Sequence, residues 1–440
     1  MPETVVLVAT LDTKGVEAWY LKEQIEKHGV HTLVVDGGIL GQPQWEAEIS
    51  REEVARLGGL TLSQVQALHH EGKAMEVMIR GAARVVQELY RAGKLDGIIS
   101  LGGSMGTSLG TGAMRALPFG VPKLMVSTMA SRDTRPYVGT KDIAMLYSVT
   151  DIAGLNRMTR RILTNAAGAI VGMVQTESQQ TEDSGKPFDR VYPASRRTRD
   201  RPLIAISNLG TTEGCASRAR TLLEGRGYET VVFHTVGAGG RALEECVQEG
   251  LIDGVLDISI HEVVDVLFDG DYDAGRDRLE AAGRMGIPQV IAPGNIDFIA
   301  CGDPAKLPGR YQDRKMHIHN PAICCVRANA EELKATGQVV AEKLNQAQGP
   351  VVVVIPRLGF SSFDEEGGVF WEPETDGAFT GALKASLNPS TLRRGSGQAS
   401  LRAGPEIEVI EVEAHINDPL FAETVVEVLD GLMQQMQQRK

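Results

Sequence analysis

Residues 98–110 read Ile98-Ile99-Ser100-Leu101-Gly102-Gly103-Ser104-Met105-Gly106-Thr107-Ser108-Leu109-Gly110, and the rest of the chain can be interpreted outward from them. A short apolar run ends at Leu101, a glycine-rich turn follows, and helix-compatible sequence comes next. That order predicts a buried strand, a turn and a helix, the repeating unit of α/β proteins. Glycine lets the backbone take positive φ and lets a ligand approach without a Cβ in the way.

Three interpretations of this turn compete. The first is a tight connection between a strand and a helix with no ligand, because glycine turns are common in such folds. The second is a phosphate cradle, in which backbone N–H groups at the helix N-terminus face an anion. It has neither the G-x-x-x-x-G-K-[ST] pattern of a Walker loop nor a strict G-x-G-x-x-G. The third is a nucleophile elbow, because residues 102–106 fit G-x-S-x-G.

The elbow can be tested within the sequence. A hydrolase of this type needs an acid and then a histidine downstream of its serine. The first histidine after Ser104 is His234, far outside the local domain. The phosphate cradle is therefore the favoured interpretation.

Length and charge bound the protein class. The chain has 440 residues, long enough for two domains with separate cores, and a net charge of −12. That charge argues against non-specific binding to nucleic acid or to an anionic membrane, so a small molecule is the expected partner. Five cysteines without a C-x-x-C pattern fit a reducing compartment. There is no basic signal-peptide region and no apolar run long enough for a bilayer, so we expect a cytoplasmic protein.

The first half of the chain opens as a βαβ unit. Val5 to Thr10 and Thr32 to Val35 are predicted strands, and the amphipathic stretch from Val16 to Lys27 is the predicted helix between them. The crossover predicts parallel strands. Asp36 follows the second strand, where doubly wound folds often place a ribose-binding acid. The glycine loop follows a later strand, however, so this is not an ordinary dinucleotide fingerprint.

The second half repeats the plan of the first. Gly250-Leu251-Ile252-Asp253-Gly254 parallels Gly93-Lys94-Leu95-Asp96-Gly97, and Gly286-Ile287-Pro288 parallels Gly120-Val121-Pro122. A polar stretch from Thr176 to Pro202 separates the halves. We therefore expect an α/β protein with two tandem doubly wound, Rossmann-like parallel-sheet domains, residues 1–190 and 200–440.

Candidate chemical groups lie in both halves. Lys14, in the turn after the first strand, can reach a phosphate as a point charge, while Asp12 and Thr13 can cap the following helix. In the second half the candidate catalytic residues are His234, Asp257, His317, His319 and His415. The carboxyl ends of strands in open α/β sheets line the ligand crevice, so a second site is a reasonable hypothesis. The His-x-His pair is weak support for a metal, and no metal site is predicted.

Several longer motifs resemble those of one family. They are Leu11-Asp12-Thr13-Lys14, Leu101-Gly102-Gly103-Ser104, Val126-Ser127-Thr128-Met129-Ala130-Ser131, Phe233-His234-Thr235-Val236-Gly237-Ala238-Gly239-Gly240-Arg241-Ala242, Gly254-Val255-Leu256-Asp257-Ile258, Arg314-Lys315-Met316-His317-Ile318-His319-Asn320 and His415-Ile416-Asn417-Asp418. With them the chain resembles a bacterial member of the tomato mosaic virus resistance protein family, over essentially its whole length. The plant members add a carboxy-terminal barrel domain, before which this chain stops.

The resemblance implies an ATP site in the first domain. By matching position, the residues that contact nucleotide would be Asp12, Thr13, Lys14, Ile39, Arg80, Gly103, Ser104, Met105 and Gly106. Met105 replaces a glycine typical of the family, which narrows the approach to the backbone. The resemblance also implies a homodimer, and a separate barrel-domain enzyme as a possible partner. The antiviral target of the plant members is not transferred to a bacterial chain.

These observations leave more than one functional hypothesis. The leading one is an ATP- or nucleotide-binding protein, with phosphate held by the glycine turn and Lys14. The alternative is a metabolic enzyme acting on a small phosphorylated or carboxylated substrate, with catalytic groups in the second domain. A third is an interaction protein stabilised by bound nucleotide. Turnover of ATP would favour the enzyme, and tight binding without turnover would favour the other two.

Overall fold

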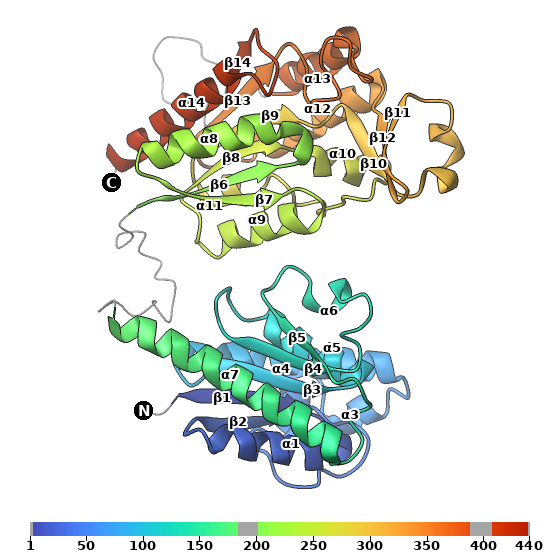
Figure 1. The fold of residues 1–440 in the computed structure, drawn as a ribbon, viewed down its shortest axis with the longest axis vertical. Coiled ribbons are helices and arrows are strands. Elements are labelled where there is room, and N and C mark those ends of the chain that lie inside the picture. Colours follow the sequence, from blue (N-terminus) through green and yellow to red (C-terminus); the bar gives the residue numbers. More distant parts are fainter. Residues whose placement is uncertain (1–2, 184–200, 388–406, 439–440) are drawn as a thin grey trace. The chain divides into compact units, whose positions relative to one another are not determined.

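The chain divides into two compact units, residues 1–193 and 194–440 (Figure 1). The computed structural model describes residues 3–183, 201–387 and 407–438. The predicted linker between Thr176 and Pro202 lies mostly outside the described residues. Each unit has its own sheet and its own hydrophobic core.

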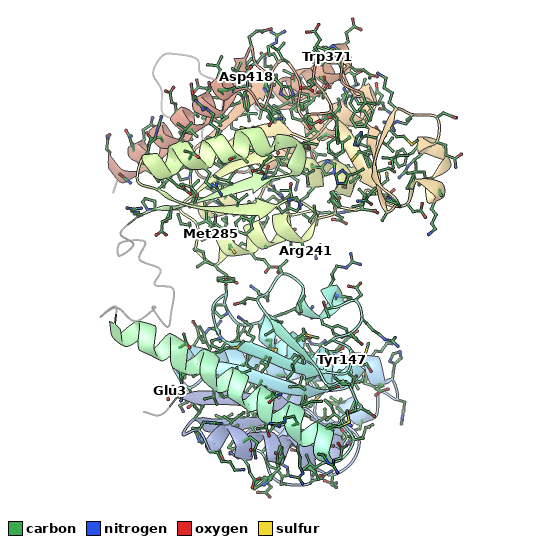
Figure 2. The ribbon with its side chains drawn as sticks, viewed as in Figure 1. Glu3, Tyr147, Arg241, Met285, Trp371 and Asp418 are labelled. Carbon is green, nitrogen blue, oxygen red and sulfur yellow. The ribbon has the colours of Figure 1, made fainter. Side chains whose placement is uncertain are left out.

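A five-stranded parallel sheet forms the centre of the first unit, in the order β2-β1-β3-β4-β5. Its strands are β1 (Thr4–Ala9), β2 (His31–Asp36), β3 (Gly97–Gly102), β4 (Lys123–Ser127) and β5 (Ala144–Tyr147). The central strands are continuous apolar runs because both faces of the sheet are covered. Tyr147, labelled in Figure 2, ends the edge strand β5.

Helices cover both faces of this sheet. One face packs against α1 (Leu11–Glu26) and α7 (Arg157–Asp183), and the other against α4 (Glu71–Arg91) and α5 (Ser104–Arg115). The remaining helices are α2 (Arg51–Gly58), which packs on α4, and the short α3 (Leu62–Gln66) and α6 (Arg135–Val138). Helix α1 begins before the predicted Val16 because residues 11–14 form its first turn, with a kink at Lys14 (φ −124°, ψ 20°).

The second unit is built on a six-stranded parallel sheet, in the order β14-β13-β9-β8-β6-β7. Its strands are β6 (Leu203–Asn208), β7 (Glu229–His234), β8 (Gly254–Ser259), β9 (Gln289–Gly294), β13 (Val351–Pro356) and β14 (Ile407–Val412). A small antiparallel sheet, β10-β12-β11, joins β10 (Phe298–Cys301), β11 (Met316–Asn320) and β12 (Ile323–Arg327).

Helices again cover both faces of the large sheet. On one face lie α8 (Glu213–Gly225) and α14 (Pro419–Gln438), and on the other lie α10 (His261–Phe268), α12 (Ala330–Leu344) and α13 (Pro373–Ser386). The other helical segments are α9 (Ala238–Gln248), α11 (Ala281–Met285), η2 (Gly210–Thr212), η3 (Pro304–Lys306) and η4 (Gly309–Tyr311).

The internal repeat is visible in the topology. Numbered along the chain within each sheet, the strands of both parallel sheets follow the order 2-1-3-4-5, and the second sheet adds a sixth strand. Gly97 and Gly254, matched in the sequence, each begin the third strand of their sheet. This order is that of a doubly wound sheet, so the predicted fold class is confirmed.

Candidate functional site

The first candidate site lies where the strand order of the first sheet reverses. The chain passes from β1 to β2 on one side and then to β3 on the other, which makes the gap between β1 and β3 a topological switch point. Val8 pairs with Ser100, so continuing this register places Thr10 beside Gly102. Helices α1 and α5 begin directly after these residues, on opposite faces of the sheet. Ligands of doubly wound proteins bind outside such a crevice.

The first turn of α5 is open to a ligand. Gly103 is its N-cap and carries no side chain to bond the first amides, and Ser104 is exposed. A Cβ on Gly103 would meet only the Thr128 hydroxyl, at 3.9 Å, whereas a Cβ on Gly102 would lie 2.8 Å from the Gly106 Cα. Position 102 therefore requires glycine, because a side chain there would clash with the backbone. The absence of a side chain at Gly103 leaves space next to the first amides of α5. Free N–H groups at a helix N-terminus favour an anion.

The first turn of α1 is occupied by the protein itself. Asp36 Oδ1 accepts hydrogen bonds from the Leu11 amide at 3.0 Å and the Gly38 amide at 2.9 Å. Asp36 is 2% exposed, and burial raises its pKa despite these amide bonds. The position typical of a ribose-binding acid therefore holds a buried helix cap. Asp12 is directed to the same loop, where its Oδ2 accepts from the Leu40 amide at 2.7 Å.

Lys14 and its neighbours lie at the same end of the sheet. The Lys14 ammonium donates to the Ile152 carbonyl, in the segment after β5, and has two further protons for other acceptors. The Thr13 hydroxyl is exposed and lies 2.9 Å from the Thr10 hydroxyl. Ile39 is half-buried in the loop after β2, and its carbonyl accepts from Gln66 at 3.1 Å.

Arg80 lies apart from this group. It is exposed on α4, nine residues after Glu71, which is roughly 14 Å along the helix. Its guanidinium donates to the Gly58 carbonyl at 3.4 Å, at the end of α2. The structure thus brings Asp12, Thr13, Lys14, Ile39 and residues 103–106 to the carboxyl edge, and places Arg80 midway along a covering helix.

Thr128 is a residue of this edge that the sequence interpretation did not include. Its amide donates to the Gly102 carbonyl at 3.3 Å, and its hydroxyl faces the bare Cα of Gly103. Ser127 fixes the segment, because its hydroxyl lies 2.6 Å from the Thr107 hydroxyl and accepts from the Met129 amide at 2.8 Å. The available signal was a pair of hydroxyl residues directly after a strand neighbouring the glycine turn.

The glycine nest of the second unit differs, because a carboxylate fills it. Glu262 Oε1 accepts from the Gly237 amide at 2.8 Å and the Gly240 amide at 3.0 Å, in the first turn of α9. A Cβ on Gly240 would collide with this carboxylate at 1.7 Å. These glycines therefore serve an internal contact. Burial raises the pKa of Glu262, against the attraction of Arg278.

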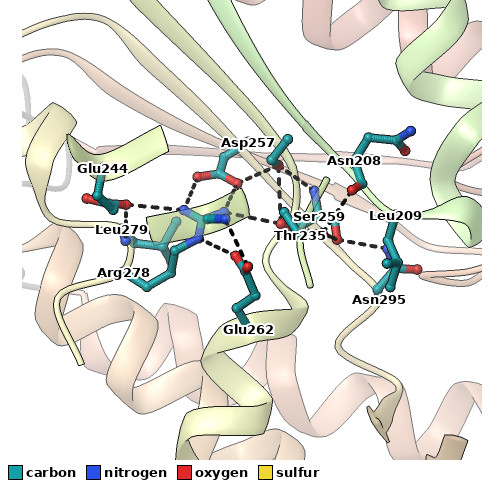
Figure 3. Close-up of polar contacts among 12 residues, drawn as sticks. Asn208, Leu209, Thr235, Glu244, Asp257, Ser259, Glu262, Arg278, Leu279 and Asn295 are labelled. Atoms are coloured by element: carbon teal, nitrogen blue, oxygen red, sulfur yellow. Dashed lines mark hydrogen bonds and ion pairs between the residues drawn. The ribbon is translucent and has the colours of Figure 1, made fainter. Parts of the chain in front are cut away.

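Arg278 joins three buried acids (Figure 3). Its guanidinium donates to Asp257 at 2.6 and 2.7 Å, to Glu262 at 2.8 Å and to Glu244 at 3.3 Å. Glu244 also accepts from the Leu279 amide at 2.6 Å. Asp257 is 2% exposed with both oxygens engaged, so the structure gives this predicted catalytic residue the role of a buried ion-pair partner.

The network continues to the sheet's own switch point, between β6 and β8. Ser207 donates to Asp257 at 2.6 Å, and the Ser259 hydroxyl contacts Thr235 at 2.8 Å and accepts from Asn295 at 2.9 Å. Asn295, at a positive φ of 62°, also contacts Thr211 at 2.5 Å. The crevice position that is open in the first sheet is therefore filled by protein side chains in the second.

The four candidate histidines have different surroundings. His234 is exposed at the end of the edge strand β7, and His319 is exposed on β11 beside a register shift. His317 lies against Phe363, with ring centroids 4.2 Å apart. His415 Nδ1 accepts from the Asn417 amide at 3.2 Å, so its Nε2 donates to the Ser361 carbonyl at 2.9 Å. His317 and His415 thus contact the same segment, residues 361–364, and His234 and Asp257 belong to other elements.

A buried acid cluster lies below that segment. Asp297 Oδ2 accepts from Ser361 at 2.7 Å and Asp364 Oδ2 from the Phe360 amide at 2.9 Å, while the Oδ1 atom of each has no hydrogen-bond partner among the described residues. Arg327 pairs with Asp376 beside them. Burial and the nearby carboxylates raise the pKa of Asp364 to about 9.

Neither a metal cluster nor a membrane-spanning helix is found in the part of the chain that the structure describes. No group of three or more His, Cys, Asp or Glu side chains there could hold a metal ion. None of the described helices is long and apolar enough to cross a membrane.

Two doubly wound units, one with an open crevice and one with a filled crevice, define this chain as a tandem Rossmann-like protein. It belongs to the uncharacterised protein family UPF0261, whose N-terminal domain matches residues 3–179 and whose C-terminal domain matches residues 201–433. A UPF0261 protein of Clostridium tetani is 39% identical over 99% of this chain and 100% of its own length.

The plant relationship suggested by the motifs is also confirmed. The ToMV resistance protein Tm-1(GCR237) of Solanum lycopersicum is 33% identical over 81% of this chain and 44% of its own length. Among solved structures, UDP-N-acetylglucosamine 2-epimerase from Rickettsia bellii matches 66% of this chain and 79% of its own, at 11% identity and a TM-score of 0.23. That likeness carries no argument about ligand or reaction.

Proposed function

We propose that the first unit binds ATP, with the phosphates at the N-terminus of α5. The observation that carries this proposal is the uncapped first turn at Gly103, located at the switch point of the sheet. In the second unit the glycine nest after β7 is closed by Glu262, and the switch point between β6 and β8 is filled by side chains that include Ser207 and Ser259. An anion at the N-terminus of α5 therefore meets free backbone donors, whereas the amides of Gly237 and Gly240 are already bonded to Glu262.

Lys14 supplies the charge in this proposal. One proton of its ammonium is held by the Ile152 carbonyl, which fixes the side chain at the carboxyl edge. The two remaining protons can bind phosphate oxygens. The positions matched to the plant family's ATP-binding region support ATP as the nucleotide. Arg80, midway along α4, would need a nucleotide that extends beyond the crevice.

Calorimetric titration of ATP into the full chain tests this function. A hydrogen bond to a charged group contributes about 1.5–3 kcal/mol, so Lys14→Ala should weaken binding roughly ten- to a hundredfold. Lys27→Ala, an exposed lysine at the end of the same helix, is the charge-matched control and should bind as wild type does. Absence of ATP binding by the folded wild-type chain, or equal affinity of the Lys14 variant, would disprove the proposal.

The enzyme alternative has one observation in its favour. Asp297 and Asp364 each carry a buried oxygen without a partner among the described residues, and perturbed acids gather at functional sites. Under this alternative the second unit transforms a small phosphorylated or carboxylated substrate, with nucleotide as substrate or regulator. Steady release of phosphate from ATP, lost in Asp297→Asn, would favour it over a binding role.

Association is a further part of the proposal. The family likeness supports a homodimer, and the plant protein's extra length supports a separate barrel-domain enzyme as partner. Sedimentation of the purified chain with and without ATP tests whether it forms a homodimer. A monomer at all concentrations would contradict it.

A further inference from the structure

A cavity of about 460 Å³ opens in the second unit, and Arg278 of the buried polar network forms part of its lining. Its walls are α10, the segment from Gly275 to Glu280, and α12. This volume is within the range of small-molecule sites, roughly 300–1,000 Å³. The predicted functions use none of these walls.

The floor of the cavity is aliphatic. Val263, Val266 and Leu267 share one face of α10, because they are spaced three and four residues apart, and Val339 faces them from α12. Glu342 and Lys343 of α12 and Gln346, just after the helix ends, also line the cavity. The cavity therefore has an apolar floor and a polar rim.

Most rim charges are already paired. Glu280 contacts Lys343 at 2.6 Å and Arg284 at 2.9 Å. Arg278, in the wall, is held by the three acids described above. Two lining charges remain, the exposed side chains of Arg276 and Glu342, for which the described residues provide no ion pair. One is a cation and the other an anion.

Arg276 and Glu342 belong to the same end of the cavity. Lys343, next to Glu342 in the chain, donates to the Arg276 carbonyl oxygen. That bond ties the 275–280 segment to α12 at the position where the two unpaired charges lie. The lining of the cavity therefore offers a ligand a guanidinium, a carboxylate and the aliphatic side chains of α10 and α12.

We propose that this cavity binds a small zwitterion with an aliphatic body, the chemistry of a branched-chain amino acid. The ligand carboxylate pairs with the Arg276 guanidinium, whose planar fork suits a carboxylate. The ligand ammonium pairs with Glu342, and the alkyl group packs on the valines of α10 and α12. A simple carboxylate would leave Glu342 unpaired, and a simple amine would leave Arg276 unpaired.

Titration of L-leucine into the full chain tests the site, with three probes that each lack one part of the ligand. These are 4-methylpentanoate without the ammonium, 3-methylbutylamine without the carboxylate, and glycine without the alkyl group. Leucine should bind most tightly, and loss of either charged contact should weaken binding roughly two- to fivefold, because both lining charges are exposed. No binding at millimolar leucine, or 4-methylpentanoate binding as tightly as leucine, would overturn the proposal.

Variants of Arg276 and Glu342 test which group of the ligand each of these two charges binds. In Arg276→Gln leucine should lose its advantage over the amine, and in Glu342→Gln its advantage over the carboxylate. Both side chains are exposed, so the variants should keep the wild-type circular dichroism and melting temperature. Lys334→Gln, an exposed position on the same helix outside the lining, is the control and should bind leucine as wild type does. Unchanged leucine affinity in both lining variants would place any binding elsewhere.

Discussion

The glycine-rich turns after β3 and after β7 differ in what their backbone amides bind. After β7, Glu262 accepts from Gly237 and Gly240 and is in turn held by Arg278. After β3, the N-cap Gly103 has no such partner. A buried carboxylate is tolerated in the second unit because amides and a guanidinium compensate its charge. Backbone amides at a helix N-terminus therefore serve stability in one unit and are available to a ligand in the other.

Arg278 should be among the residues on which the stability of the second unit depends most. Arg278→Met would leave Asp257, Glu262 and Glu244 without their shared cation. Removing one partner of a buried ion pair costs about 3–5 kcal/mol. Urea unfolding should show a loss of this size. Arg284→Met removes an exposed pair with Glu280 and should cost below about 1 kcal/mol. Similar losses for the two variants would contradict the structural role of the network.

Asp364 should make stability fall with rising pH. Its pKa in the folded chain is about 9, raised by burial and by the Asp297 and Asp376 carboxylates, so the folded state holds a proton that the unfolded state releases near its ordinary pKa. Stability from this proton is complete below the ordinary carboxyl range and is lost as pH rises towards about 9. The slope for one proton is about 1.4 kcal/mol per pH unit.

Asp364→Asn removes this titration while keeping an oxygen for the Phe360 amide. Between pH 5 and pH 8 the wild type should therefore lose up to about 4 kcal/mol more than the variant. Urea midpoints at several pH values measure the difference. Parallel pH profiles for the two proteins would show that Asp364 is ionised in the folded chain.

At the scale of elements, the sequence predicts what is local. The βα turn at residues 98–110 could be identified because its apolar run, glycines and helix follow one another directly. Helix α1 begins earlier than the hydrophobic period predicts, because the polar residues 12–14 hide its first turn. The acids around Arg278 come 16, 21 and 34 residues before it, and no periodicity relates these positions. Arg278 and these acids come into contact only when the sheet of the second unit is assembled.

The residues of the candidate site can also be divided into those that the local sequence predicts and those that depend on the tertiary structure. Gly103 and Lys14 could be named because each lies at the end of a predicted strand. The role of Asp36 as a cap could not, because it depends on how closely β2 places its carboxylate to the Leu11 amide. Thr128 likewise depends on the pairing of β4 with β3.

A methyl group at Gly103 should affect binding more than folding. The position has φ −78° and nothing nearer than 3.9 Å to an added Cβ, so Gly103→Ala should cost below about 1 kcal/mol. The methyl group narrows the approach to the first-turn amides. Loss of one hydrogen bond from these amides to phosphate should weaken ATP binding roughly tenfold or more.

Gly102→Ala is the matched comparison. Its Cβ would lie 2.8 Å from the Gly106 Cα, a backbone atom, so we expect a stability loss of about 1–3 kcal/mol. Thermal melting and ATP titration separate the two effects. If Gly103→Ala binds ATP as wild type does, the phosphates do not approach this turn.

At the scale of the whole molecule, two units share one strand order and differ in their crevices. Each has a separate core, so each can unfold as its own cooperative unit. A ligand of one unit stabilises that unit by RT ln(1 + [L]/Kd), about 2.7 kcal/mol at a hundredfold excess over Kd. For a unit of this size that is a shift of about 5–10 °C in melting temperature.

Scanning calorimetry of the full chain should therefore show two unfolding transitions, and ATP should raise the melting temperature of one of them. Lys14→Ala should reduce that shift and leave the other transition in place, because the lysine belongs to the first unit. At pH 8, Asp364→Asn should raise the melting temperature of the other transition, which ATP leaves unchanged. The reason is that the Asp364 carboxyl lies in the core of the second unit. A single transition that ATP shifts as a whole would mean that the units unfold together. An ATP shift confined to the transition that responds to Asp364→Asn would place the nucleotide in the second unit.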